Sequence, residues 1–279
     1  MSNPVPINKK TISILGCGWF GLELAKKLVQ KGHIVKGSST TMEKLPLLAT
    51  YHIRPFLVDI KKDTAHYDPD FFKTDLLFIC IPPKRNTSEQ SDFYSKIEQI
   101  VNAAIKNQIK QVLFISSTAV YGDTNEEVTE LSIPQPETAS GKAMLRTEQL
   151  LHDQKEFTST IIRFAGLVGP QRHPGRFFAG KTHVPNGKAP INLIHLNDCV
   201  GLSMAILENE NFGYTFNACA PDHPSKQVFY TLATINAQLS PPLFVDELLS
   251  WKKVSTVHSH LLNYNYLVSD WINWLKDEN

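Results

Sequence analysis

The most informative stretch of this 279-residue chain is Thr11-Ile12-Ser13-Ile14-Leu15-Gly16-Cys17-Gly18-Trp19-Phe20-Gly21. Its first five residues predict a buried strand, and the apolar periodicity that follows predicts an amphipathic helix from Phe20 to Gln30. Three glycines with the spacing Gly-x-Gly-x-x-Gly come between the strand and the helix. In that position the pattern is typical of a loop that binds the diphosphate of a dinucleotide at a helix N-terminus. A glycine-rich turn without a ligand is the alternative.

Each glycine of this loop is expected to have its own role. Gly16 permits the tight turn after the strand, Gly18 lets the backbone approach the diphosphate, and Gly21 allows the helix to pack against the strand. Trp19 and Phe20 are expected mainly to pack. The predicted cofactor-binding residues of the loop are Gly16, Gly18, Trp19, Phe20 and Gly21.

The next strand, predicted from His33 to Ser38, indicates which dinucleotide is bound. In NAD sites an Asp or Glu about 20 residues beyond the glycines binds the ribose 2′-hydroxyl and would repel a 2′-phosphate. This carboxylate is missing here, and the chain offers hydroxyls and a lysine instead. We therefore expect NADP rather than NAD, with NAD as the alternative. The residues predicted to hold the phosphate end are Ser38, Ser39, Thr40 and Lys44. Ser39 to Thr41 would also serve as a cap for a helix from Thr41 to Ala49.

Strands and helices alternate over the first half of the chain. Further strands are predicted at Pro55 to Ile60, Leu76 to Ile81, Gln111 to Ser116 and Ser159 to Phe164, and helices at Phe93 to Lys106 and Lys142 to Leu151. This order predicts an α/β fold with a doubly wound parallel sheet of the Rossmann type. After residue 165 the regular alternation of strands and helices ends, and the predicted elements become shorter and less regular. We expect a dinucleotide-binding domain over residues 1–165, to which part of 190–220 returns, and a smaller cap region over 166–279.

Composition restricts the partners. The 28 basic and 27 acidic side chains are scattered and give a net charge of +1, so neither nucleic acid nor an anionic membrane is an expected partner. No apolar run approaches the about 20 residues that a membrane span needs, and the opening residues lack an apolar h-region, so neither a membrane span nor a signal peptide is expected. The four cysteines are far apart and show no metal spacing, so no metal site is expected. These features predict a cytoplasmic protein that binds a small molecule.

Several segments taken together resemble the extended short-chain dehydrogenase/reductase superfamily, in its NAD-dependent epimerase/dehydratase-like branch. They are the glycine loop, Val58-Asp59-Ile60, Phe114 to Gly122, Ile162 to Pro170 and Ile194 to Asp198. The resemblance implies that Asp59 and Ile60 flank the adenine and that Phe164, Ala165 and Gly166 lie near the nicotinamide. It also implies that the cofactor is lined by Ile81, Pro82, Pro83 and Ser116.

Catalysis in this superfamily uses a Ser or Thr, which corresponds to Ser117, and a Tyr-x-x-x-Lys pair on a helix. The matching segment here is Thr138-Ala139-Ser140-Gly141-Lys142, which keeps the lysine and has no tyrosine. An aliphatic hydroxyl is far less acidic than a phenol, so Thr138 cannot serve as the usual acid or base. The pattern resembles the atypical subgroups of the superfamily.

Two residues are therefore the candidates for catalysis. Lys142 binds the nicotinamide ribose if it acts as the family lysine does, and it would share a helix face with Thr138 if the helix extends back that far. The alternative is a solvated helix lysine. Ser117 either orients a substrate or only ends a strand with a backbone hydrogen bond. Tyr121 is interpreted as a packing residue, with a substitute base as the less favoured alternative.

The region after residue 166 offers a possible substrate contact. Arg172 and Arg176 follow Gly169-Pro170, where the family's substrate loop begins, and guanidinium groups suit a phosphate or carboxylate. Solvated surface residues are the alternative. His195 is given no role, and Asp198 is interpreted as the N-cap of a helix from Cys199 to Leu207.

Three functions are compatible with these features. The favoured one is an oxidoreductase or epimerase that moves a hydride between NADP(H) and an unidentified small substrate, anionic or a sugar nucleotide, by a mechanism without the usual tyrosine. The second is a non-catalytic NAD(P)-binding sensor or regulator. The third, an interaction protein with an empty fold, is disfavoured by the intact glycine loop.

Overall fold

The computed structural model describes residues 9–83 and 92–277. Its strands are β1 (Thr11–Leu15), β2 (Ile34–Ser39), β3 (Arg54–Ile60), β4 (Ala65–Tyr67), β5 (Leu76–Ile79), β6 (Gln111–Ser117), β7 (Glu126–Val128), β8 (Thr158–Phe164), β9 (Gly166–Val168), β10 (Leu193–His195), β11 (Thr215–Ala218) and β12 (Lys252–Val254). Its α-helices are α1 (Trp19–Gln30), α2 (Leu45–Thr50), α3 (Phe93–Lys106), α4 (Ala139–His152), α5 (Leu196–Glu208), α6 (Lys226–Asn236), α7 (Ser259–Leu262) and α8 (Trp271–Asp277).

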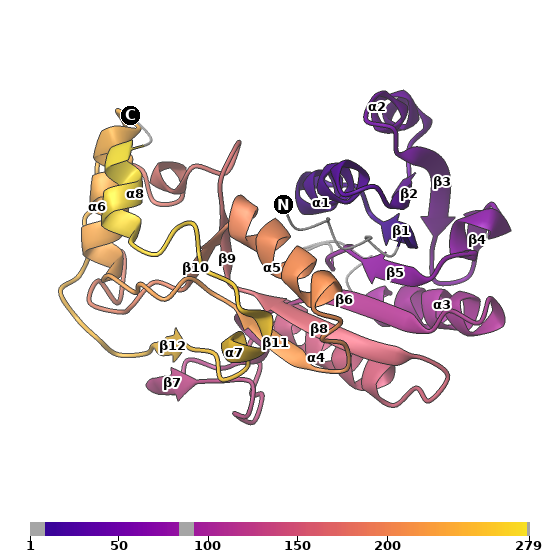
Figure 1. Ribbon diagram of the computed structural model, residues 1–279. Helices are drawn as coiled ribbons and strands as arrows, with labels where there is room; N and C mark the ends of the chain where they lie inside the picture. Colours follow the sequence, from indigo (N-terminus) through magenta and orange to yellow (C-terminus); the bar gives the residue numbers. More distant parts are fainter. Residues whose placement is uncertain (1–8, 84–91, 278–279) are drawn as a thin grey trace, which may run out of the picture. The chain divides into compact units, whose positions relative to one another are not determined.

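The main sheet has eight strands in the order β11-β8-β6-β5-β1-β2-β3-β4 (Figure 1). The pairs β1/β2, β1/β5, β2/β3 and β5/β6 are parallel, and only the β3/β4 pair is antiparallel among those with a described register. Parallel neighbours need helical crossovers, which α1 supplies between β1 and β2. The predicted doubly wound α/β sheet is confirmed.

The chain divides into two compact units, each built from separate stretches. The first contains Met1–Ser116, Lys142–Ile162 and Ile206–Tyr214, and the second contains Ser117–Gly141, Arg163–Ala205 and Thr215–Asn279. The division into 1–165 and 166–279 stays a prediction.

The core of the first unit lies along β1 and β5. Ile12 and Ile14 of β1 are fully buried, and all four residues of β5 are buried as well. From α1 the buried face presents Phe20, Leu24 and Leu28. The continuous burial of β5 is what a central parallel strand requires, since helices cover both faces of such a sheet.

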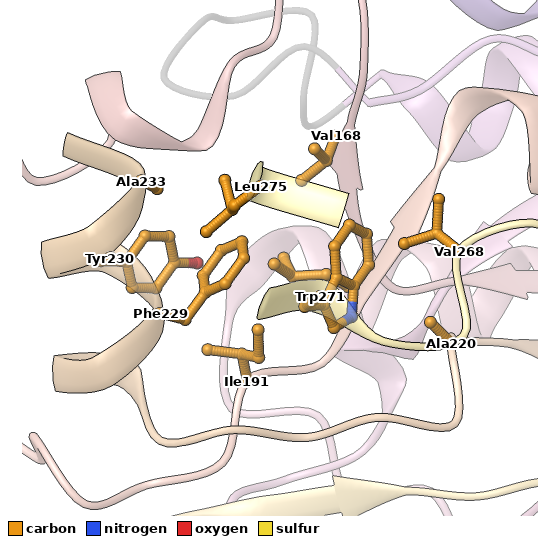
Figure 2. Close-up of a cluster of buried hydrophobic side chains, with 10 residues drawn as sticks. Val168, Ile191, Ala220, Phe229, Tyr230, Ala233, Val268, Trp271 and Leu275 are labelled. Carbon is orange, nitrogen blue, oxygen red and sulfur yellow. The ribbon is translucent and has the colours of Figure 1, made fainter. Parts of the chain in front are cut away.

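The second unit has a core of its own, shown in Figure 2. Phe229 and Tyr230 project from α6 toward Trp271 and Leu275 of α8, and the rings of Phe229 and Trp271 meet edge to face with centroids 5.7 Å apart. Removal of these large aromatic surfaces from water holds the two helices together.

Four predicted helix starts differ from the structure, and the smallest difference is at α1, which begins one residue early, at Trp19. The helix expected from Thr41 begins instead as a 3₁₀ turn at Met42–Lys44, and α2 follows from Leu45, because Pro46 fits only the first turn of an α-helix. The helix expected from Lys142 begins three residues earlier, at Ala139. The helix expected from Cys199 begins at Leu196.

Among the described residues, no helix combines the length and the hydrophobicity that crossing a bilayer requires.

Candidate functional site

The glycine loop has the geometry that its spacing predicts. Gly16 has a φ of +100°, and a Cβ there would lie 2.8 Å from Ile81 Cγ2. A Cβ on Gly21 would lie 2.2 Å from the carbonyl oxygen of Gly16, so only glycine lets α1 approach the end of β1 this closely. A Cβ on Gly18, in contrast, would have no heavy atom within 4 Å. The protein's own packing explains the first and third glycines and leaves the space beside Gly18 open.

The N-terminus of α1 follows directly from this loop. Gly18 is its N-cap and provides no side-chain cap, and its first turn holds no acidic residue. Helix N-termini attract anions through their amide hydrogens and the helix dipole. Phe20 is buried and Trp19 half-buried, as packing residues are. Burial raises the pKa of the Cys17 thiol to about 12, so it stays protonated near neutral pH.

Ser38 ties the glycine loop to β2. Its Oγ accepts a hydrogen bond from the amide of Gly16 at 2.9 Å, and its carbonyl oxygen accepts one from the amide of Cys17 at 3.0 Å. Ser38 is only 3% exposed. Of the predicted phosphate-binding residues, this one contacts the loop itself.

The other predicted phosphate-binding residues lie after β2. Ser39 is half-buried, and Thr40 and Lys44 are exposed. Thr41 donates its amide to Ser39 Oγ at 3.1 Å, but its own side chain makes no capping hydrogen bond to the 3₁₀ turn. The Thr41 hydroxyl pairs instead with the Ser39 hydroxyl at 3.3 Å.

Lys36 lies on β2 just before this segment and is buried. Its Nζ donates to the carbonyl oxygen of Lys73 at 2.9 Å and pairs with Asp70 Oδ2 at 3.1 Å. Lys36 therefore fastens β2 to the segment before β5. Its charge is compensated within the protein.

Five of the residues that the family resemblance assigned to the cofactor lie in the first unit, at the end of β3 and in the segment after β5. Ile81 fills the space that a Cβ on Gly16 would need, Pro82 is exposed and Pro83 is buried. Asp59 ends β3 together with the buried Ile60 and pairs with Lys61 at 3.0 Å. In the sheet, β3 is separated from β1 by β2.

Ser116 has a partner that the sequence did not reveal. Its Oγ donates to Oε1 of Glu148 on α4, and both side chains are buried. A buried carboxylate that accepts a hydrogen bond at the end of a central strand is a candidate part of the site. The one signal in the sequence was the helical period that places Glu148 on the same face as Met144 and Leu151.

The segment expected to hold the catalytic pair has a different geometry from the expected one. Thr138 precedes α4, and its Oγ1 accepts the amide of Gly141 at 3.0 Å, which is the contact of a helix N-cap. The helix does not extend back to Thr138, so the condition under which Thr138 and Lys142 would share a helix face is not met. Lys142 is exposed. Ser117 Oγ accepts the amide of Ala119 at 3.2 Å, so the backbone hydrogen bond expected as one alternative is present.

Tyr121 belongs to a buried network in the second unit. Its hydroxyl donates to Asn217 Oδ1 at 2.9 Å and accepts from Arg163 Nη1 at 2.6 Å, and the side chain is 2% exposed. Burial raises the pKa of the Tyr121 phenol. These contacts support the interpretation of Tyr121 as a packing residue rather than as a substitute base.

Phe164, Ala165 and Gly166 lie where β8 leads into β9. The first two are buried, and Gly166 donates its amide to Asn192 at 3.0 Å. Arg172 and Arg176 are both exposed, on either side of the start of the 3₁₀ turn Pro174–Arg176. The exposure fits a surface role and leaves both side chains accessible to an anion.

Asp198 is not the N-cap of its helix. It lies inside the first turn of α5 and is fully buried, and its carboxylate accepts from the Tyr264 hydroxyl at 2.8 Å and from the amides of Leu267 and Val268 at 2.7 and 3.1 Å. The sequence suggested a local cap, but these contacts are with the C-terminal segment. His195, given no role, accepts the Asn197 amide at 3.2 Å.

A family model and a relative in Escherichia coli identify the family of this chain. A family model described as NAD(P)H-binding matches residues 16–192, which is more than half of the chain. The chain belongs to this NAD(P)H-binding family. The NAD(P)H-binding chain is also 36% identical to Protein YeeZ of Escherichia coli (strain K12) over 246 residues, which are 87% of this chain and 89% of YeeZ.

Solved structures show the same fold. The NAD(P)H-binding chain superposes with a TM-score of 0.77 on UDP-glucuronic acid 4-epimerase from Bacillus cereus in complex with NAD, at 17% identity over 96% of this chain and 99% of that one. A short-chain dehydrogenase/reductase superfamily protein from Agrobacterium tumefaciens with bound NAD gives 0.76 at 15% identity, over 96% and 95% of the two chains. The predicted resemblance is confirmed at the level of an NAD(P)H-binding family, the Rossmann-type fold is confirmed, and a nicotinamide cofactor is supported.

Proposed function

We propose that this chain binds NADP(H) at the glycine loop and uses it for hydride exchange with a small substrate, as an oxidoreductase or epimerase. The observation that carries the proposal is the open space at Gly18, where a Cβ would meet nothing within 4 Å. Gly16 and Gly21 are required by the chain's own packing, whereas Gly18 is not. A diphosphate close to the Gly18 backbone is the ligand that its position in the motif suggests.

The choice of NADP rests on the segment after β2. Ser39 and Thr40 carry hydroxyls there, and the exposed Lys44 supplies a positive charge suited to a 2′-phosphate. No carboxylate follows Ser38 at the end of β2 until the exposed Glu43, which lies within the 3₁₀ turn. The ribose acid that favours NAD is therefore missing from the strand end.

The substrate class is suggested by the similar structures and by the second unit. The epimerase from Bacillus cereus acts on UDP-glucuronic acid, as its name states. A sugar nucleotide or another small anion would find guanidinium groups at Arg172 and Arg176, both accessible. A bound nicotinamide would supply the hydride. We assign Ser117 to orienting the substrate, with its Oγ held by the Ala119 amide.

A second candidate function is a dinucleotide sensor without turnover. The start of α4 favours it, because the helix contains no tyrosine and the Thr138 hydroxyl only caps it. In that case NADP(H) binding would stabilise one conformation, and no reaction would follow.

Titration of the purified protein with NADPH and NADH, followed by nicotinamide fluorescence, tests the cofactor. We expect tighter binding of NADPH. Equal affinity or a preference for NADH would refute the phosphate argument, and lack of binding of either would refute the whole proposal. Incubation with sugar nucleotides and small carbonyl compounds, with NADPH consumption as the readout, separates the two functions. Binding without consumption across the whole panel would favour the sensor.

A further inference from the structure

The direction in which Lys142 points follows from the burial pattern of α4. The helix has one buried face with the spacing of three and four residues that faces a core. Its members are Gly141, Met144, Thr147, Glu148 and Leu151. Lys142 is exposed and does not belong to this face.

Two contacts fix what this face packs against. Glu148 accepts the hydrogen bond of Ser116, the penultimate residue of β6. A Cβ on Gly141 would lie 2.3 Å from the carbonyl oxygen of Ala119, in the turn that follows β6. The buried face of α4 is therefore the face toward the carboxyl end of β6, where ligands bind in open parallel sheets.

Helical geometry then separates Lys142 from Met144. Each residue of an α-helix is rotated by about 100° from the one before it, so Lys142 lies about 160° away from Met144 around the axis. Met144 is 7% exposed and lies four residues before Glu148, on the same side. No hydrogen bond or ion pair joins Lys142 to another residue in the described part of the chain.

We propose that Met144, and not Lys142, is the residue of α4 that faces the bound dinucleotide. The inference rests on the proposed NADP(H) binding and adds to it. The chain then carries a thioether where the superfamily has its lysine, and Lys142 is a surface residue. The position four residues before Met144 is occupied by Ser140, so neither position provides a group that titrates near neutral pH. The positions of α4 that match the superfamily's tyrosine and lysine then contribute no acid or base, and any proton exchanged in turnover comes from another group.

Acetylation of surface lysines in the wild-type protein tests this orientation directly. The rate at each lysine is followed by peptide mass spectrometry, with and without saturating NADPH. Lys44, which we assign to the 2′-phosphate, is the internal control and should be protected by about fivefold or more. Lys142 should react at an unchanged rate. Protection of Lys142 together with Lys44 would overturn the inference, whereas failure to bind NADPH at all would instead refute the proposed function.

Substitutions provide the second measurement. Lys142→Ala should leave the Kd for NADPH within about twofold, whereas Met144→Ala should raise it by about fivefold or more through lost apolar contact. Met144→Leu conserves side-chain volume and should restore binding. A tenfold weaker Kd for Lys142→Ala, or an unchanged Kd for a folded Met144→Ala protein, would contradict the inference. If Met144→Ala does not fold, the acetylation rates in the wild-type protein decide.

Discussion

Replacement of Gly18 by alanine should separate ligand binding from folding. Gly18 has φ −85° and ψ −153°, extended backbone that alanine also adopts, and a Cβ there would meet nothing within 4 Å. Alanine is a poorer N-cap than glycine by up to about 1 kcal/mol, but it also lowers the entropy of the unfolded chain, which stabilises by about 0.4–1 kcal/mol. We therefore expect the free energy of unfolding to change by less than about 1 kcal/mol.

The effect on binding should be much larger. A methyl group beside the backbone would hold the diphosphate away from the amide hydrogens of α1. The loss of one hydrogen bond to a charged phosphate costs about 1.5–3 kcal/mol, so the Kd for NADPH should rise by about 10- to 150-fold.

Urea denaturation and nicotinamide fluorescence titration of the same preparation measure the two effects. Gly21→Ala is the matched control, because its Cβ would lie 2.2 Å from the Gly16 carbonyl oxygen and should reduce both stability and binding. A folded Gly18→Ala protein that binds NADPH as the wild type does would show that no diphosphate lies beside Gly18.

Three further substitutions follow from contacts described above. Lys44→Ala should weaken NADPH binding by about tenfold and leave NADH binding unchanged, as measured by parallel titrations. The hydrogen bond from Lys36 holds the pKa of Asp70 below its usual value. The stabilising contribution of the Lys36–Asp70 pair is therefore present above about pH 4 and is lost as the pH falls through the lowered pKa of Asp70. Asp70→Asn should abolish that part of the pH dependence of the urea midpoint. Tyr121→Phe should lower the free energy of unfolding by about 1–3 kcal/mol, because Arg163 loses a buried acceptor.

Each of these predictions can fail separately. Equal losses of NADPH and NADH affinity in the Lys44→Ala protein would refute a contact between Lys44 and the 2′-phosphate. Unchanged acid unfolding of the Asp70→Asn protein would show that the ion pair contributes nothing to stability. A fully stable Tyr121→Phe protein would mean that another group accepts from Arg163.

The elements nearest the glycine loop could be predicted from the sequence almost to the residue. The strand Thr11–Leu15 was predicted with its observed bounds, and the helix Trp19–Gln30 begins one residue earlier than expected. The helix Phe93–Lys106 was also predicted with its observed bounds. In these segments, the residues that mark the element boundaries and the strong apolar period both agree with the tertiary structure.

The site beyond the loop depends on contacts between residues far apart in the chain. The bond between Ser116 and Glu148 spans 32 positions, and the carboxylate of Asp198 meets amides about 70 positions later. Apolar periodicity carries no information on such polar pairs. The start of α4 was missed for a local reason, because Thr138 was compared with a catalytic tyrosine and not considered as an N-cap.

The bond from the Gly16 amide to Ser38 Oγ has a practical consequence for changing cofactor preference. An engineer who wished to favour NAD would place an acidic residue at the end of β2, and Ser38 is the first position to suggest itself. A carboxylate there would be buried behind the loop and would displace the hydroxyl that holds Gly16, so the redesigned loop would lose its shape before any ribose could be recognised. Ser39, one residue further and more accessible, is the position at which selectivity could be altered with the loop left intact.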